Sequence, residues 1–358
     1  MGLRTTMCGL TVELSAVSPA WSQLVERALG GPTGATESPG LPGDAAEEVP
    51  TDVVITVEDT ADPFPVGHLA PVTRGAWADG GTVVIEDACG SGVDLRLEPR
   101  PSHLVVTARP RPAVRHRLLR VAAPGRTELL HRAAVLQYPA LWWAGRTGAV
   151  PLHVSAARVG PLGVVLAGPG GVGKSTVLGT LPPAAGRPVS DNVCSWDGRT
   201  VWALPEPRRV GPDTPEVQPA VEGPGRRPRR GRMPHGREER DWTQRQPGVE
   251  PDLVLVVSRG TGTGPAVTLE SPDRCARVLA AGTYAAGELS RYWAFSATLA
   301  LATGIGPPHP AVTEAADRLA AAVPCARVEL GRHAGPVSLV ELVEKATALP
   351  GPPKEVAR

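Results

Sequence analysis

The chain has 358 residues, with 37 Lys+Arg, 36 Asp+Glu and a formal net charge of +1. This length favours two to three domains, and an apolar content of 42% is enough for one or more sizeable hydrophobic cores. A net charge so close to zero argues against a general nucleic-acid binder. No apolar stretch approaches the length of a membrane span and no signal-peptide pattern is visible, so we expect no membrane partner.

Cysteine and lysine are both scarce in this chain. The five cysteines are widely spaced and form no Cys-x-x-Cys pair, which argues against a disulfide framework or a zinc site and predicts a cytoplasmic protein. Only Lys174, Lys345 and Lys354 are lysines among the 37 basic residues. A lysine in such an arginine-rich chain points to a position that needs a compact ammonium group.

Residues 1–125 are predicted to form an N-terminal α+β domain. Residues 30–50 are rich in Gly, Pro and acidic residues and indicate a flexible loop. Short β-like runs follow, separated by Gly, Pro and Asp at intervals typical of an antiparallel sheet. These runs are Val53–Val57, Thr82–Ile85, Val93–Leu97, Leu104–Thr107 and Leu118–Val121.

Residues 126–358 are predicted to form a second domain of the α/β class. It begins with a helix over 126–146, which Pro139 is expected to kink. Residues 163–167 are apolar on both faces, as expected for a buried central strand of an α/β sheet. Further strands are expected at 152–159, 187–190, 201–204, 253–257, 266–269 and 326–330, and further helices at 174–181, 272–281, 286–302 and 338–348.

Residues 205–250 form a polar excursion rich in Pro and Arg, which we expect to be mobile. It contains a basic run over Arg226–Arg232. Two interpretations stay open, namely a flap that brings guanidinium groups to a phosphate or an acidic peptide, and a solvated loop. Nucleic-acid binding is not favoured, because only Trp242 lies near this run for base stacking.

The most specific motif is the run Gly168-Pro-Gly-Gly-Val-Gly-Lys-Ser-Thr176, which matches the Walker A pattern G-x-x-x-x-G-K-[ST]. A strand candidate precedes it and a helix candidate follows it, as in known phosphate-binding loops. Backbone N–H groups and the helix N-terminus are expected to cradle phosphates, with Lys174 on the β- and γ-phosphates and the Ser175 hydroxyl on Mg²⁺. The predicted ligands are ATP and Mg²⁺, and the predicted cofactor-binding residues are Gly168, Gly170, Gly171, Val172, Gly173, Lys174, Ser175 and Thr176.

Phosphoryl transfer also requires an acidic residue near the γ-phosphate. Asp191 lies 17 residues after Lys174, at the end of the strand candidate 187–190. Because ligands gather at the carboxyl ends of strands in open α/β sheets, this position favours a metal ligand or a general base, with an Asx turn as the alternative. Asp252 precedes its strand, so we expect it at the end of the sheet opposite the glycine-rich loop. Glu206 is a further acidic residue, but only its closeness to Asp191 in the sequence supports a role for it.

His153 lies on the strand candidate that should pair beside the strand of the loop. An imidazole there can hydrogen-bond a phosphate or orient an acceptor. A core histidine with satisfied hydrogen bonds fits the sequence equally well.

Together these motifs resemble the catalytic domain of HPr kinase/phosphorylase and its relatives. The resemblance rests on three segments, namely Leu152-His153-Val-Ser-Ala-Ala, the strand and loop 163–176, and Pro188-Val-Ser-Asp191-Asn192. It covers residues 127–205 well and residues 251–348 loosely. It implies a P-loop kinase core like that of phosphoenolpyruvate carboxykinase, with catalytic roles for His153, Lys174 and Asp191. It also implies phosphorylation of a serine hydroxyl on a protein or peptide, such as the lasso-peptide precursors that some relatives modify.

One residue departs from the family pattern, because Asn192 stands where the family has a second acid. An Asn carbonyl can still coordinate Mg²⁺ beside Ser175 and Asp191, but it cannot act as a base. Two functions therefore stay open: a serine kinase, and a nucleotide-binding accessory protein without efficient transfer. The acceptor and the oligomeric state stay open as well, and a homo-oligomer is compatible with the sequence.

Overall fold

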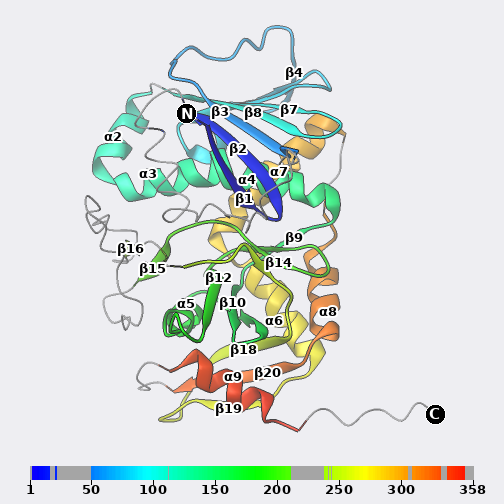
Figure 1. Ribbon diagram of the computed structural model, residues 1–358. Coiled ribbons are helices and arrows are strands. Elements are labelled where there is room, and N and C mark those ends of the chain that lie inside the picture. The colour runs from blue at the N-terminus through cyan, green and yellow to red at the C-terminus, as the bar shows by residue number, and fades with distance from the viewer. Residues whose placement is uncertain are drawn as a thin grey trace, which may run out of the picture.

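The structure is a computed structural model that describes residues 2–16, 21, 50–111, 113–210, 238–240, 242, 244–304, 309–331 and 337–350. Within these residues the chain is a mixed α/β protein, as expected, with an eight-stranded sheet at one end and a region of smaller sheets and helices at the other (Figure 1). The predicted loop over 30–49 and the basic run Arg226–Arg232 lie outside the described residues. No helix in the described ranges is both long and apolar enough to cross a membrane.

An eight-stranded sheet is built from the first 110 residues, and its order is β1-β2-β3-β8-β7-β6-β5-β4. Most neighbours are antiparallel as predicted, but β3 runs parallel to both β2 and β8. Long connections precede and follow β3, and parallel neighbours require such connections. The strands are β1 (Gly2–Met7), β2 (Leu10–Ala16), β3 (Val53–Val57), β4 (Ala70–Thr73), β5 (Ala76–Ala78), β6 (Val83–Ile85), β7 (Val93–Pro99) and β8 (Leu104–Pro110).

The predicted strand over Leu118–Val121 is wrong, because these residues lie in helix α2 (Val114–Ala122). Val114, Leu118 and Val121 recur at steps of four and three residues, which is the helical period, but a short apolar run does not distinguish the two structures. All three side chains are largely exposed.

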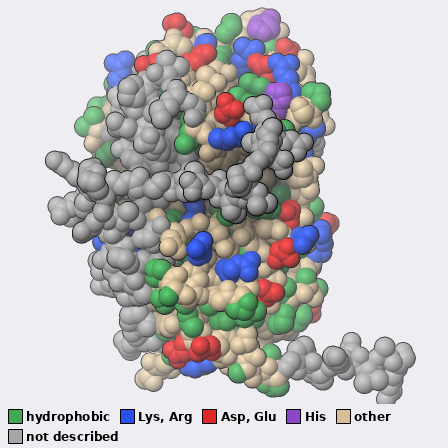
Figure 2. All heavy atoms as spheres, in the orientation of Figure 1, with side chains coloured by type: hydrophobic (Ala, Val, Ile, Leu, Met, Phe, Trp, Pro, Cys, Tyr) green, Lys and Arg blue, Asp and Glu red, His purple; other side chains and the backbone are tan. Residues whose placement is uncertain are grey.

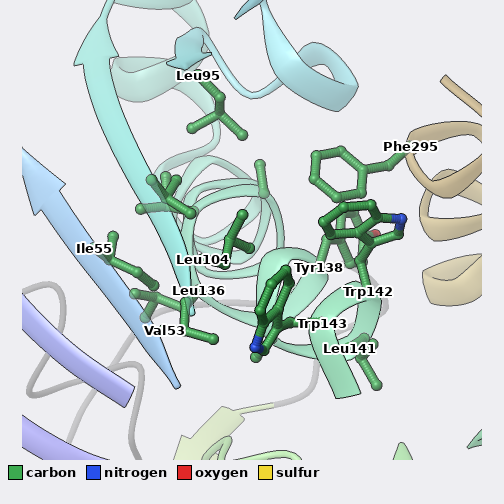
Figure 3. Close-up of a cluster of buried hydrophobic side chains, with 14 of the residues drawn as sticks. Val53, Ile55, Leu95, Leu104, Leu136, Tyr138, Leu141, Trp142, Trp143 and Phe295 are labelled. Carbon is green, nitrogen blue, oxygen red and sulfur yellow. The ribbon is translucent and has the colours of Figure 1, made fainter. Parts of the chain in front are cut away.

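One face of the eight-stranded sheet is covered by helices that follow it in the chain. Helix α4 (Tyr138–Ala144) packs on β2, β3 and β8, and α7 (Gly287–Thr303) packs on β4, β5 and β6. Figure 3 shows Trp142 and Phe295 among the apolar side chains of the sheet. A single core therefore joins strands before the expected boundary at 125–126 to helices after it, and helix α3 (Pro124–His131) itself crosses that position.

The helix expected over 126–146 consists of α3, a π-helical segment (Arg132–Gln137), α4 and a short 3-10 turn (Gly145–Thr147). The π-helical segment lies just before Pro139, which has no N–H to donate to the preceding turn. The irregularity therefore occurs where the sequence predicted a kink.

A six-stranded sheet forms the middle of the second region, with the order β12-β10-β11-β18-β20-β19. The strands are β10 (Ser155–Val159), β11 (Leu162–Ala167), β12 (Gly186–Ser190), β18 (Leu253–Gly260), β19 (Ala266–Leu269) and β20 (Cys325–Gly331). Helices α6 (Pro272–Tyr284) and α8 (Val312–Ala322) cover one face, while α5 (Lys174–Gly179) and α9 (Leu339–Thr347) cover the other. Successive residues of β11 point into the two cores in turn, which explains its continuous apolar run.

A four-stranded sheet lies between the two larger ones (Figure 1) and contains β9 (Val150–Leu152), β13 (Cys194–Trp196), β14 (Val201–Ala203) and β17 (Gly248–Val249). The single strand expected over 152–159 is therefore divided between two sheets, and His153 lies in the break. The ends of the excursion form a further two-stranded sheet of β15 (Arg208–Val210) and β16 (Glu238–Arg240). On the face in Figure 2, acidic and basic side chains are interspersed over the described surface.

Candidate functional site

The glycine-rich loop leaves the carboxyl end of β11 and leads directly into α5. Gly168, Gly171 and Gly173 have φ values of 148°, 77° and 116°, a region that residues with a side chain rarely adopt. A Cβ atom on Gly168 would lie 2.5 Å from the backbone oxygen of Val257, so the close approach of β18 also requires glycine there. The loop therefore exposes backbone in a conformation that the glycines make possible.

Lys174 lies folded back against this loop. Its side chain is 5% exposed, and its Nζ donates hydrogen bonds to the backbone oxygens of Gly168 (2.7 Å) and Pro169 (3.2 Å). Burial lowers the pKa of Lys174 to about 8, although the carboxylates of Asp191 and Glu288 act in the opposite direction. An anion bound to the loop would raise this pKa again, because it would stabilise the ammonium form.

Asp191 follows β12 at the same edge of the sheet as the loop. Both β11 and β12 are antiparallel to β10, which lies between them, so their carboxyl ends lie at one edge. The backbone oxygen of Asp191 accepts hydrogen bonds from the hydroxyls of Ser155 (2.8 Å) and Ser175 (3.3 Å). Ser175 of the loop and Asp191 at the strand end are thus in contact, although 16 positions separate them in the sequence.

His153 reaches this edge from the break between β9 and β10. Its Nδ1 lies 3.2 Å from the backbone oxygen of Gly282, and its backbone N–H donates to the Thr283 hydroxyl at 3.0 Å. Burial, with a smaller contribution from the charge of Lys174, lowers the pKa of His153 to about 4. The imidazole is therefore a buried group with a hydrogen-bond partner on α6, as the core interpretation predicts, and it lies near Lys174; its contact with a phosphate or an acceptor stays a prediction.

A cluster of charged side chains that the sequence did not indicate adjoins Asp191. Arg209 donates to Glu288 (2.5 Å) and lies 3.5 Å from Glu206, while its backbone N–H lies 3.4 Å from Asp191 Oδ2. Glu206 is 4% exposed, and burial raises its pKa to about 7 despite the opposing charges of Arg209 and Arg132. We call Glu206, Arg209 and Glu288 the charged cluster.

Sequence reasoning missed the charged cluster because its members come from unconnected segments. Glu206 lies between β14 and β15 and Arg209 lies in β15, whereas Glu288 lies in the first turn of α7. No motif or spacing links these residues. The only available signal was the proximity of Glu206 to Asp191 in the sequence, which does not by itself identify a contact.

A cavity of about 410 Å³ lies beside the charged cluster. Asn192, which is 8% exposed, is in its wall, next to Asp191 in the chain. The other walls come from α3, the π-helical segment, α4 and the first turn of α7. The cavity therefore lies between the helices that support the eight-stranded sheet and the edge of the six-stranded sheet that carries the loop.

Asp252 lies at the opposite end of the six-stranded sheet, as expected. Its Oδ2 accepts a hydrogen bond from the backbone N–H of Gly163 (2.7 Å), near the start of β11. Within the described ranges, no group of three or more His, Cys, Asp or Glu side chains is arranged to hold a metal ion. A magnesium ion bound mainly through phosphates and water does not require such a group.

No protein-family model matches the chain, and no curated protein matches it significantly.

Proposed function

We propose that the protein is an ATP- and Mg²⁺-dependent kinase that transfers the γ-phosphoryl group to a serine hydroxyl of a protein or peptide in the cytoplasm. The observation that carries this proposal is that the Ser175 hydroxyl donates to the backbone oxygen of Asp191, while the Asp191 carboxylate is close enough to act on the charge of Lys174, so residue 191 lies beside the glycine-rich loop at one sheet edge. We also propose that the chain has a P-loop kinase core like that of HPr kinase/phosphorylase, which its motifs resemble.

The loop fits a polyphosphate because its glycines adopt conformations in which successive N–H groups can face one anion. Lys174 can turn from the loop carbonyls to the β- and γ-phosphates, while the Ser175 hydroxyl, Asp191 and Asn192 supply oxygen ligands for Mg²⁺. The bound ATP and ion supply the phosphoryl group and neutralise its charge.

Asp191 is the proposed base for the acceptor hydroxyl. A carboxylate at the end of β12 can accept the proton of a serine that approaches from the adjacent cavity. His153 stays neutral above about pH 4 and adds no positive charge next to Lys174. The serine oxygen gains the phosphoryl group, ADP leaves, and the proton passes to Asp191.

A second function is favoured by one observation, which is the amide at position 192. The side chain beside Asp191 that borders the cavity is Asn192 and carries no negative charge. If transfer requires an acid there, the protein binds nucleotide as an accessory protein without efficient transfer.

The direct test is ATP·Mg²⁺ binding by calorimetry with Lys174→Ala. Removing the ammonium that contacts two phosphates should weaken binding by about a hundredfold or more. Lys345→Ala is the matched control, because Lys345 lies on α9 in an exposed pair with Glu341 and should leave affinity unchanged. Equal affinities for the wild type and Lys174→Ala would overturn the assignment of the nucleotide site.

A further inference from the structure

Arg259 is a cationic side chain beside the glycine-rich loop, and the proposed phosphoryl transfer leaves it without a role. It lies near the end of β18, the strand that runs parallel to β11 on the side away from β10. A Cβ atom on Gly173 would lie 3.6 Å from Nη2 of Arg259 and 3.1 Å from Cδ1 of Leu330. The guanidinium therefore lies next to the last glycine of the loop.

The direction of the Arg259 side chain follows from the alternation along β18. Leu255 and Val257 point into the core that α5 and α9 cover, and residues two apart on a strand share a face. Arg259 continues this series, and its register partner on β20, Leu330, belongs to the same core. Arg259 thus lies on the face of the sheet that carries α5, at the edge from which the loop leaves.

The charge of Arg259 is not taken up by a neighbouring acid. Arg259 is exposed, and among the residues that the structure describes its side chain forms neither an ion pair nor a hydrogen bond. The acid on the adjacent strand is Glu329, which points to the other face of the sheet and pairs with Arg327. An exposed guanidinium without an acidic partner is available to a phosphate group.

The two sides of the loop strand carry opposite charges. In the sheet order β12-β10-β11-β18, Asp191 follows β12 on one side of β11, and Arg259 lies near the end of β18 on the other (Figure 1). Three strand spacings of about 4.8 Å separate β12 from β18, which leaves room for a metal ion and a chain of phosphates between these side chains. The proposed function places Mg²⁺ and the γ-phosphate at Ser175 and Asp191, so the other end of the triphosphate is directed towards β18.

We propose that Arg259 binds the α-phosphate of the donor nucleotide, so that the site recognises a chain of three phosphates. Two N–H groups of the guanidinium donate to oxygens of the α-phosphate, while Lys174 and the loop hold the β- and γ-phosphates. This inference rests on the proposed kinase function, because that function fixes which end of the triphosphate lies at Asp191.

The test measures, by calorimetry on the full chain, the binding of the magnesium complexes of ATP, tripolyphosphate and pyrophosphate. Arg259→Ala should weaken the binding of ATP and of tripolyphosphate about tenfold, because both lose two charge-assisted hydrogen bonds. It should change the binding of pyrophosphate by less than about twofold, because the two phosphates fill the β- and γ-positions and the remaining effect of the charge is screened.

Two further variants sharpen the test. Arg259→Lys should give affinities for ATP and tripolyphosphate between those of the wild type and Arg259→Ala, because an ammonium keeps the charge but not the paired donors. Arg187→Ala is the matched control, because Arg187 is also exposed and lies on the same sheet, but at the start of β12 and at the edge opposite the loop. It should leave all three affinities unchanged.

The possible outcomes separate this inference from the proposed function. Unchanged ATP affinity in Arg259→Ala would overturn the inference, and so would an equal loss for all three ligands, which indicates a general effect of charge. A loss for ATP alone would also overturn it, because Arg259 would then contact the nucleoside. In these cases the wild type still binds ATP·Mg²⁺ and the proposed function stands, whereas a wild type that does not bind ATP·Mg²⁺ would overturn both.

Discussion

The glycine-rich loop and the charged cluster lie at the same edge of the six-stranded sheet, yet they are built in different ways. The loop is a run of consecutive residues, and its conformation depends on glycines at 168, 171 and 173. The cluster consists of side chains from two distant segments, joined by the ion pairs of Arg209 with Glu206 and Glu288.

Under the proposed function, this difference separates nucleotide binding from phosphoryl transfer. A backbone cradle recognises any polyphosphate and tolerates changes in neighbouring side chains. Side chains that are buried and paired are sensitive to the loss of a single partner, because the remaining charge stays buried. We therefore expect substitutions at the loop to act on nucleotide affinity, and substitutions around Asp191 to act on transfer or on stability.

The largest expected effect is that of Asp191→Asn on phosphoryl transfer. Removal of the base should lower the transfer rate by about 10²–10⁴-fold, while ATP affinity changes by only a small factor because the loop and Lys174 are intact. Single-turnover transfer and calorimetry on the same preparation measure the two quantities. Undiminished transfer by Asp191→Asn would show that another residue is the base. The residues around Asp191 would then not be the site of phosphoryl transfer.

Arg209→Met should break the charged cluster and lower the free energy of unfolding by about 2–4 kcal/mol, because Glu206 is left buried without its closest cation. Urea denaturation provides the measurement. Arg199→Met is the matched control, since Arg199 pairs with Glu250 and both side chains are exposed, so it should change stability by less than about 1 kcal/mol. The double variant Arg209→Met/Glu206→Gln should recover part of the loss, and no recovery would contradict this explanation.

His153 should make the stability of the protein depend on pH. Its pKa is lowered to about 4 from 6.5 in the unfolded chain, so the unfolded state binds the proton first as the pH falls. The free energy of unfolding should therefore decrease by about 1–2 kcal/mol between pH 7 and pH 5 through this group alone. His153→Gln should remove that part of the slope, whereas His68→Gln, at an exposed position, should retain it.

The smallest expected effect is that of Asn192→Asp. If the protein is a kinase that relies on Asp191, the second acid should change transfer by only a small factor, because an Asn carbonyl already supplies a metal ligand. Transfer assays on the wild type and this variant check the expectation. A wild type without transfer, together with a variant that gains ATP hydrolysis, would favour the accessory function.

Local patterns were sufficient to predict much of the fold. The continuous apolar run 163–167 indicated a strand buried on both faces, and β11 lies between two cores. The alternation of Val53, Ile55 and Val57 indicated a strand with one buried face, and β3 has that pattern. Several elements were not predicted, including β1, β2, β4, β5 and α8.

By itself the sequence determined the glycine-rich loop and its place between a strand and a helix, because the loop is built from consecutive residues. It also indicated that Asp191 ends a strand. Only the tertiary structure decided that β12 and β11 end at one edge, that His153 lies in a break between two sheets, and that Glu206, Arg209 and Glu288 meet. Those arrangements depend on strand order and on contacts between distant segments, and the packing of the whole chain sets both.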